Sequence, residues 1–141
     1  MDEFSVLLVD DEKDFLETLL KRLLKRRIKA TGADSGEEAL KILKETPPDV
    51  VVLDVRMQGM GGIQTLKEIK KIRPLVEVIM LTGHANLEVA VEGMEAGAFD
   101  YLMKPTDVDE LLYKLEDAFK RKKIQEQKIR RLEEDKQLEK G

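Results

Sequence analysis

Short apolar runs alternate along the chain with stretches in which apolar residues recur at helical spacing. Continuous runs rich in valine and leucine are typical of strands buried on both faces of a parallel sheet. Two such runs occur at residues 6–9 and 50–53, and a third at residues 76–81 is broken only by Glu77. Residues 101–103 predict a short last strand. Residues 27–31 are more polar and predict a weaker strand near an edge of the sheet.

Amphipathic helices are predicted between these runs, because apolar residues return there every three or four positions. The first helix contains two such series, Phe15-Leu19-Leu23 and Leu16-Leu20-Leu24. Ser35, with Glu38 three residues later, forms a capping-box pattern that predicts the start of the second. Further helices are expected over residues 63–72 and 87–96, the latter ending at Gly97, and a last one is expected from Asp107 onwards.

The strand–helix order repeats about five times. Such alternation is typical of an α/β fold, a mostly parallel sheet with helices on both faces. In folds of this kind the binding crevice lies at the carboxyl ends of the strands, where the strand order reverses. The residues directly after each strand are therefore the first candidates for chemistry.

Charge is unevenly distributed over the 141 residues, although the net charge is only −4. Residues 1–116 carry 16 basic and 23 acidic side chains, a net charge of −7, whereas residues 117–141 carry nine and six, a net charge of +3. An acidic body is a poor surface for nucleic acid, so we expect no direct nucleic-acid binding. There is no cysteine, no membrane-length apolar run and no signal-peptide pattern, and a cytoplasmic location is expected.

Polar side chains stand at the carboxyl end of nearly every predicted strand. They are Asp10 and Asp11 after the first strand, Asp54 after the third, Thr82 after the fourth and Lys104 after the fifth. The fold rule gathers three carboxylates, a hydroxyl and an ammonium group at one edge of the sheet.

This set of groups suits magnesium-dependent phosphoryl transfer. Crowded carboxylates repel one another unless a cation intervenes, and Mg²⁺ prefers such hard oxygen ligands. Asp54 is the best candidate for a nucleophile that forms an aspartyl phosphate, because it ends a central strand and an open loop comes after it. Asp10 and Asp11 are better placed as metal ligands, while Lys104 and Thr82 could neutralise the phosphoryl oxygens.

Four motifs in this order resemble the receiver domains of two-component response regulators. They are Leu7-Leu8-Val9-Asp10-Asp11-Glu12, Leu53-Asp54-Val55-Arg56-Met57, Leu81-Thr82-Gly83-His84 and Lys104-Pro105. The resemblance covers about residues 4–120 and implies a flavodoxin-like fold with five parallel strands. The region from Leu81 to Pro105 is most similar to receivers of enhancer-binding activators of the nitrogen-regulator type.

The resemblance also implies the chemistry of the site. Asp54 would accept a phosphoryl group from a phosphohistidine on a sensor histidine kinase or phosphotransfer protein. Mg²⁺ would be held by Asp11, Asp54 and the carbonyl group of Arg56, with Asp10 supporting it through water. Such a protein catalyses only its own phosphorylation and dephosphorylation and is not an enzyme for outside substrates.

Switching residues are implied by the same resemblance. Lys104 would contact the phosphate, and the Lys104–Pro105 peptide bond would be cis. Thr82 would turn towards the phosphoryl group, and Tyr101 would change rotamer with it. Arg56 and His84 would flank the route of the attacking water and modulate the lifetime of the phosphoryl group, although His84 is also consistent with an ordinary exposed loop residue.

One position departs from the family pattern. The loop after the phosphoacceptor usually contains a proline where this chain has Gln58, which restores a backbone N–H and loosens the loop.

The last predicted helix continues beyond the length that the fold requires. We expect a receiver domain over residues 1–120 and, at 121–141, a charged helical linker or a weak coiled coil, since the seam Leu111-Leu115-Ala118-Lys122-Gln125-Ile129-Leu132-Lys136 is apolar only at its ends. The resemblance to receiver domains also implies a homodimer that uses the surface of residues 87–120. The chain is interpreted either as a stand-alone receiver or as part of a longer regulator with a C-terminal output domain.

Three other functions fit the sequence less well. The acidic set argues against a pseudo-receiver that works without phosphorylation. Magnesium-dependent phosphohydrolases of the haloacid dehalogenase type need a second aspartate where this chain has Arg56. A flavodoxin would need a neutral phosphate loop in place of Asp10 and Asp11.

Overall fold

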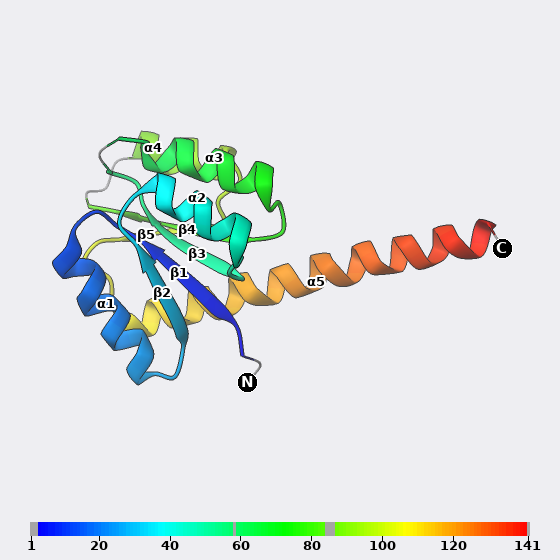
Figure 1. Ribbon diagram of the computed structural model, residues 1–141, viewed down its shortest axis with the longest axis horizontal. Coiled ribbons are helices and arrows are strands. Elements are labelled where there is room, and N and C mark those ends of the chain that lie inside the picture. The colour runs from blue at the N-terminus through cyan, green and yellow to red at the C-terminus, as the bar shows by residue number, and fades with distance from the viewer. Residues whose placement is uncertain (1–2, 58, 84–86, 141) are drawn as a thin grey trace.

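Five parallel strands form the centre of the molecule in the computed structural model, which describes residues 3–57, 59–83 and 87–140 (Figure 1). The strands are β1 (Ser5–Val9), β2 (Lys29–Ala33), β3 (Val50–Asp54), β4 (Glu77–Thr82) and β5 (Asp100–Met103). The helices are α1 (Lys13–Lys25), α2 (Gly36–Glu45), α3 (Gly62–Ile72), α4 (Leu87–Glu95) and α5 (Val108–Lys140). The strand order is β2-β1-β3-β4-β5, which confirms the flavodoxin-like doubly wound α/β fold.

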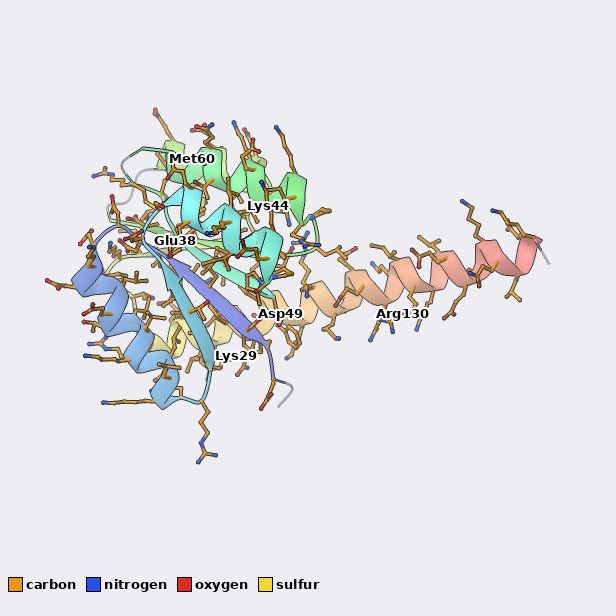
Figure 2. The ribbon with its side chains drawn as sticks, viewed as in Figure 1. Lys29, Glu38, Lys44, Asp49, Met60 and Arg130 are labelled. Carbon is orange, nitrogen blue, oxygen red and sulfur yellow. The ribbon has the colours of Figure 1, made fainter. Side chains whose placement is uncertain are left out.

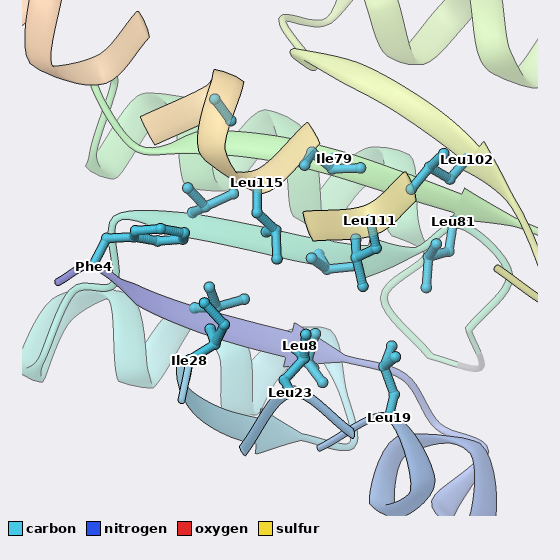
Figure 3. Packing of buried hydrophobic residues seen from close by; sticks show 14 of the residues in the cluster. Phe4, Leu8, Leu19, Leu23, Ile28, Ile79, Leu81, Leu102, Leu111 and Leu115 are labelled. Atoms are coloured by element: carbon cyan, nitrogen blue, oxygen red, sulfur yellow. The ribbon is translucent and has the colours of Figure 1, made fainter. Parts of the chain in front are cut away.

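Two hydrophobic cores lie on opposite faces of the sheet. Side chains of α1 and α5 pack against one face around Leu8, Leu23 and Leu115 (Figure 3). Side chains of α2 and α3 pack against the other face around Leu7, which is fully buried, and α4 covers the same face. Alternate residues of each strand serve opposite cores, because successive side chains of a strand point to opposite faces. This explains why β1, β3 and β4 are apolar without interruption at their centres.

The strand order reverses between β1 and β3. From β1 the chain moves outward to β2 at one edge, and from β3 it moves through β4 to β5 at the other. The carboxyl ends of β1 and β3 therefore flank the topological switch, which is where ligands bind in open α/β sheets. Asp10 and Asp54 stand at these two ends.

Local geometry explains where the elements differ from the sequence pattern. The edge strand β2 begins at Lys29 rather than at residue 27, because Arg27 takes a left-handed backbone conformation with φ of 62°. In α1 the buried residues are Leu16, Leu19 and Leu23, whereas Leu24, the last member of the second series, is 55% exposed. A helix buries one stripe, so two parallel apolar series cannot both be fully covered.

Helix boundaries agree closely with the predicted caps. The Ser35 hydroxyl oxygen accepts a hydrogen bond from the Glu38 N–H at 3.1 Å, which is one half of the predicted capping box. Asp107 accepts from the Asp109 N–H at 3.0 Å at the start of α5. Gly97 comes after α4 with a positive φ of 107°, which glycine adopts without strain.

Helix α5 is a single uninterrupted helix of 33 residues. Its first part packs on the sheet, and its second part projects beyond the domain (Figure 1). Leu111, Leu115 and Ala118 are its buried residues, and most positions after Lys122 are exposed. None of the helices in the described ranges combines the length and apolar character that a membrane span requires.

Candidate functional site

The structure gathers the polar residues that end the strands at one edge of the sheet. Asp10 comes directly after β1, Asp54 ends β3, Thr82 ends β4 and Lys104 comes directly after β5. The three central strands are in register, so their last residues lie side by side, with Val9 opposite Leu53 and Asp54 opposite Leu81. Asp10, Asp54 and Thr82 are all buried, which is unusual for such polar side chains and typical of a functional site.

Lys104 is the cation of this site. Its Nζ atom donates hydrogen bonds to Oδ2 of Asp10 and Oε1 of Glu12, both at 2.8 Å. Oδ2 of Asp54 lies further away, at 3.9 Å. The ammonium group also lies 4.2 Å from the ring centroid of Phe15, a cation–π arrangement that helps to fix its position.

Burial shifts the proton equilibria of the site. The pKa of Asp54 is raised from 3.8 to about 6, first because the carboxyl is desolvated and second because the charge of Asp10 is close. The hydrogen bond from the Arg56 N–H to Oδ1 at 3.2 Å and the charge of Lys104 partly oppose this rise. In the protein without metal, the Asp54 carboxyl therefore holds a proton more easily than an ordinary aspartate.

The pKa of Lys104 moves in the direction that keeps it charged. Desolvation favours the neutral amine, but the hydrogen bonds to Asp10 and Glu12 outweigh it and raise the pKa. Lys104 is thus a permanent positive charge among carboxylates. It balances part of their charge and leaves the group acidic overall.

Three carboxylates of the site are close enough to share a cation. One oxygen each from Asp10, Glu12 and Asp54 lies within 4.8 Å of the others. Glu12, which is exposed, was not among the predicted ligands, while the predicted Asp11 is half-buried at the same turn. An all-oxygen donor set with an excess of negative charge fits Mg²⁺. The Arg56 carbonyl and Asp11 stay predictions as ligands.

The turn after β3 is held by backbone contacts. The Val55 N–H donates to the Leu81 carbonyl at 3.0 Å, and the Gly62 N–H donates to the Val55 carbonyl at 3.1 Å. The Arg56 side chain is exposed at the rim of the site. Gln58 lies outside the described residues.

The predicted switching residues lie on β4, β5 and the turn after β5. The Thr82 hydroxyl donates to the sulfur of Met103 at 3.6 Å, its neighbour in β5, and Tyr101 is 41% exposed on the same strand. The Lys104–Pro105 peptide bond is cis, as the resemblance implied. His84 lies outside the described residues, so its predicted role stays a prediction.

Glu12 and Phe15 are site residues that the sequence pattern did not identify. Glu12 stands out in the sequence only as part of a motif, and Phe15 only as part of a helical series. Both lie within five positions of Asp10, at the start of α1. For Glu12, the available signal in the sequence was its position as a polar residue in the first turn after β1. Their contact with Lys104 spans about 90 residues of sequence, which a local pattern does not show.

The chain belongs to the response regulator receiver domain family, whose sequence pattern it matches over residues 6–116. Within that family its relatives are regulators of the NtrC type. It is 38% identical over 122 residues to the DNA-binding transcriptional regulator NtrC of Escherichia coli K12 and 42% identical over 118 residues to the transcriptional regulatory protein ZraR of the same strain. These matches cover 86% and 83% of this chain but 26% of each relative, so the chain spans about a quarter of their length.

Solved structures agree with this assignment. A crystal structure of NtrX from Brucella abortus in complex with ADP superposes with a TM-score of 0.84 at 32% identity, covering 89% of this chain and 29% of that one. A CheY-like receiver domain protein from Methanospirillum hungatei superposes with a TM-score of 0.82 at 27% identity, covering 88% and 99%. The second match shows that a chain of little more than this fold adopts the same structure.

Proposed function

We propose that this chain is a phospho-accepting signalling switch in which Asp54 receives a phosphoryl group. The observation that carries the proposal is the position of Asp54, a buried carboxyl 3.9 Å from the Lys104 ammonium group and within 4.8 Å of two further carboxylates. The ionised Asp54 carboxylate does not stabilise the folded state, because desolvation raises its pKa to about 6. A chemical role is the simplest explanation for its presence.

In the proposed reaction a carboxylate oxygen of Asp54 attacks the phosphorus atom of a phosphohistidine on a sensor histidine kinase or phosphotransfer protein. The new P–O bond forms as the P–N bond breaks, and the imidazole nitrogen leaves with the electron pair. Lys104 lies close enough to Asp54 to contact the transferred oxygens. Water later breaks the same P–O bond and releases inorganic phosphate, so the protein acts only on its own phosphoryl group.

Mg²⁺ is the proposed cofactor. Asp10, Asp54 and the predicted Asp11 and Arg56 carbonyl would hold it, with Glu12 close enough to take part. When bound, the ion supplies positive charge that allows a phosphate to approach the carboxylates. The protein's own contribution is to hold the oxygens at one edge of the sheet and to keep Lys104 charged.

The proposed response runs through Thr82 and Tyr101. Thr82 would leave its contact with Met103 and turn towards the phosphoryl group, which would change the surroundings of Tyr101 two residues before Met103. The surface of residues 87–120 exposes Leu87, Val91, Met94, Tyr101, Met103 and Tyr113, which supports a partner or a second copy there. The proposal also includes a cytoplasmic homodimer and an output domain that follows residue 141 and responds to the switch.

Phosphorylation of the full chain with acetyl phosphate and Mg²⁺, with peptide mass spectrometry as the readout, tests the central step. We expect the label on Asp54 alone, and none without Mg²⁺. Asp54→Asn should abolish labelling, whereas Asp14→Asn, which changes an exposed aspartate of α1, should leave it unchanged. Undiminished labelling of the Asp54→Asn variant would show that another residue accepts the phosphoryl group.

A further inference from the structure

The amino-terminal edge of the sheet, opposite the Asp54 site, holds helix α5 at the point where the helix leaves the domain. Two consecutive basic residues of α5 contact two acidic residues there. Lys122 Nζ lies 2.6 Å from Oδ1 of Asp49, which directly precedes β3. Arg121 Nε lies 3.5 Å from Oε2 of Glu77, the first residue of β4.

The Asp49–Lys122 pair is the stronger of these contacts. The two side chains are only 25% and 15% exposed, so water screens their attraction much less than at an open surface. Oδ2 of Asp49 also accepts hydrogen bonds from the Ser5 N–H at 2.9 Å and from the Ser5 hydroxyl at 3.4 Å. Asp49 therefore joins α5 to β1 and β3 at once. Figure 2 shows Asp49 beside α5, where the helix leaves the domain.

Glu77 and Phe119 extend the same junction. Glu77 is buried, forms an ion pair with Lys70 at 3.3 Å, and its N–H donates to the Asp49 carbonyl at 3.3 Å. One turn before Lys122, the ring of Phe119 stacks on that of Phe4 with centroids 4.9 Å apart. Residues 119–122 of α5 thus contact the beginnings of β1, β3 and β4 within one helical turn.

The two ion pairs lie beyond the hydrophobic core, whereas the Phe4–Phe119 stack belongs to its rim. The last buried core residue of α5 is Ala118. The junction instead sets the direction of the remaining helix, since about 18 residues, roughly 27 Å at 1.5 Å per residue, extend beyond Lys122. A small change of angle at the junction would displace the far end of this arm by many ångströms.

We propose that the Asp49–Lys122 and Glu77–Arg121 contacts clamp α5 to the central strands, so that residues 123–140 are a rigid arm of fixed direction that phosphorylation does not redirect. The strands that hold the clamp at their beginnings, β3 and β4, end at Asp54 and Thr82. The second half of this proposal rests on the proposed function. The start of β5 is also tied to α5, by the Lys114–Asp100 ion pair and by Arg121 at 5.8 Å from the ring centroid of Phe99. Regulation would then move α4 and the carboxyl end of β5 against a stationary arm, because the clamp residues belong to α5, to β4 and to the position before β3.

Distances measured between spin labels test both halves, and the absence of native cysteines makes introduced cysteines specific. One pair joins Lys29 on the edge strand to Arg130 on the arm, and a second joins Glu92 on α4 to Arg130; all three side chains are exposed. In the otherwise unchanged full chain, we expect a single narrow distance distribution for the first pair. With beryllofluoride and Mg²⁺, the first distance should stay the same while the second shifts.

The clamp is tested by charge removal. Lys122→Met combined with Arg121→Gln should broaden the first distribution at least twofold, because the arm then pivots about residue 119. Lys128→Met, which removes an exposed lysine from the same helix, is the matched control and should leave the width unchanged. Circular dichroism of each variant checks that α5 stays helical.

The possible failures are distinct. A broad distribution in the parent, or an equal width in the Lys122→Met, Arg121→Gln variant, would overturn the clamp. A shift of the first distance with beryllofluoride would overturn the fixed direction. If beryllofluoride changes neither distance and phosphorylation of Asp54 also fails, the proposed function is wrong, whereas the measurements without beryllofluoride still decide the clamp.

Discussion

The Nζ atom of Lys104 lies 3.9 Å from Oδ2 of Asp54, beyond hydrogen-bonding distance, while it donates to Asp10 and Glu12 at 2.8 Å. Lys104 therefore lowers the pKa of Asp54 only through space. The hydrogen bonds to Asp10 and Glu12 hold Lys104 beside Asp54, and Lys104 forms no hydrogen bond to the Asp54 oxygen Oδ2. This arrangement suits Lys104, because the phosphoryl group that it is proposed to contact is present only when Asp54 is phosphorylated.

Replacement of Lys104 by alanine should raise the pKa of Asp54 above about 6 in the metal-free protein, because the nearest positive charge is lost. A carboxyl ¹³C titration monitored by NMR measures this pKa. The variant should still fold and bind Mg²⁺, but its spectral response to beryllofluoride should be much weaker than that of the parent. The same titration of Lys128→Met is the control, and an unchanged or lower pKa in Lys104→Ala would contradict the electrostatic role.

Stability should depend on pH through Asp54. Its folded pKa of about 6 lies above the ordinary 3.8, so between these values the folded state keeps a proton that the unfolded chain has lost, and stability falls as pH rises. At pH 7 without metal this amounts to at most about 3 kcal/mol, since one pKa unit corresponds to ~1.4 kcal/mol. Asp54→Asn should therefore gain stability over the parent at pH 7 and much less at pH 4.

Urea denaturation of both proteins in EDTA at the two pH values measures this difference. The amide oxygen of the introduced asparagine can still accept the hydrogen bond from the Arg56 N–H, so the pH-dependent part of the stability difference reports on the ionisation of Asp54. An equal difference at pH 4 and pH 7 would show that Asp54 titrates normally.

Gly62 should tolerate no side chain. A Cβ atom there would lie 2.5 Å from the Val55 Cα and 2.6 Å from the Asp54 carbonyl oxygen, and backbone atoms cannot move aside as side chains do. Gly62→Ala should lower the free energy of unfolding by about 2 kcal/mol or more and slow labelling of Asp54, because the turn after β3 must shift. A Cβ at Gly61 would meet nothing within 4 Å, so Gly61→Ala is the control and should change stability by no more than about 0.5 kcal/mol.

Phosphorylation should change the balance of monomer and dimer, because the proposed response reshapes the exposed surface around Tyr101. Sedimentation velocity with and without beryllofluoride, on the full chain and on a chain cut after Lys120, measures it. The cut removes Arg121 and Lys122 with the arm, so a dimer change that survives in the short chain uses the residue 87–120 surface alone. An unchanged distribution in both chains at micromolar concentrations would contradict the dimer switch.

The sequence alone showed which polar residues stand at the end of each strand. Valine- and leucine-rich runs with Asp10, Asp54, Thr82 and Lys104 at their ends placed these groups at one edge, because parallel strands end on the same side of a sheet. Capping by Ser35 and Asp107 was equally local, since a cap bonds to a backbone N–H two or three residues away. Each of these features depends on neighbours in sequence or on a general rule of the fold.

Only the tertiary structure decided which of these groups pair. Lys104 donates hydrogen bonds to Asp10 and Glu12 but not to Asp54, and Lys122 donates one to Asp49, 73 positions earlier in the sequence. Such contacts depend on how far apart the packed elements lie, which no local sequence pattern shows. The seam of the last helix had shown Lys122 as a polar interruption of a weak coiled coil. In the fold the same residue lies against the beginning of β3, since packing of Leu111, Leu115 and Ala118 on the sheet brings this face of the helix to Asp49.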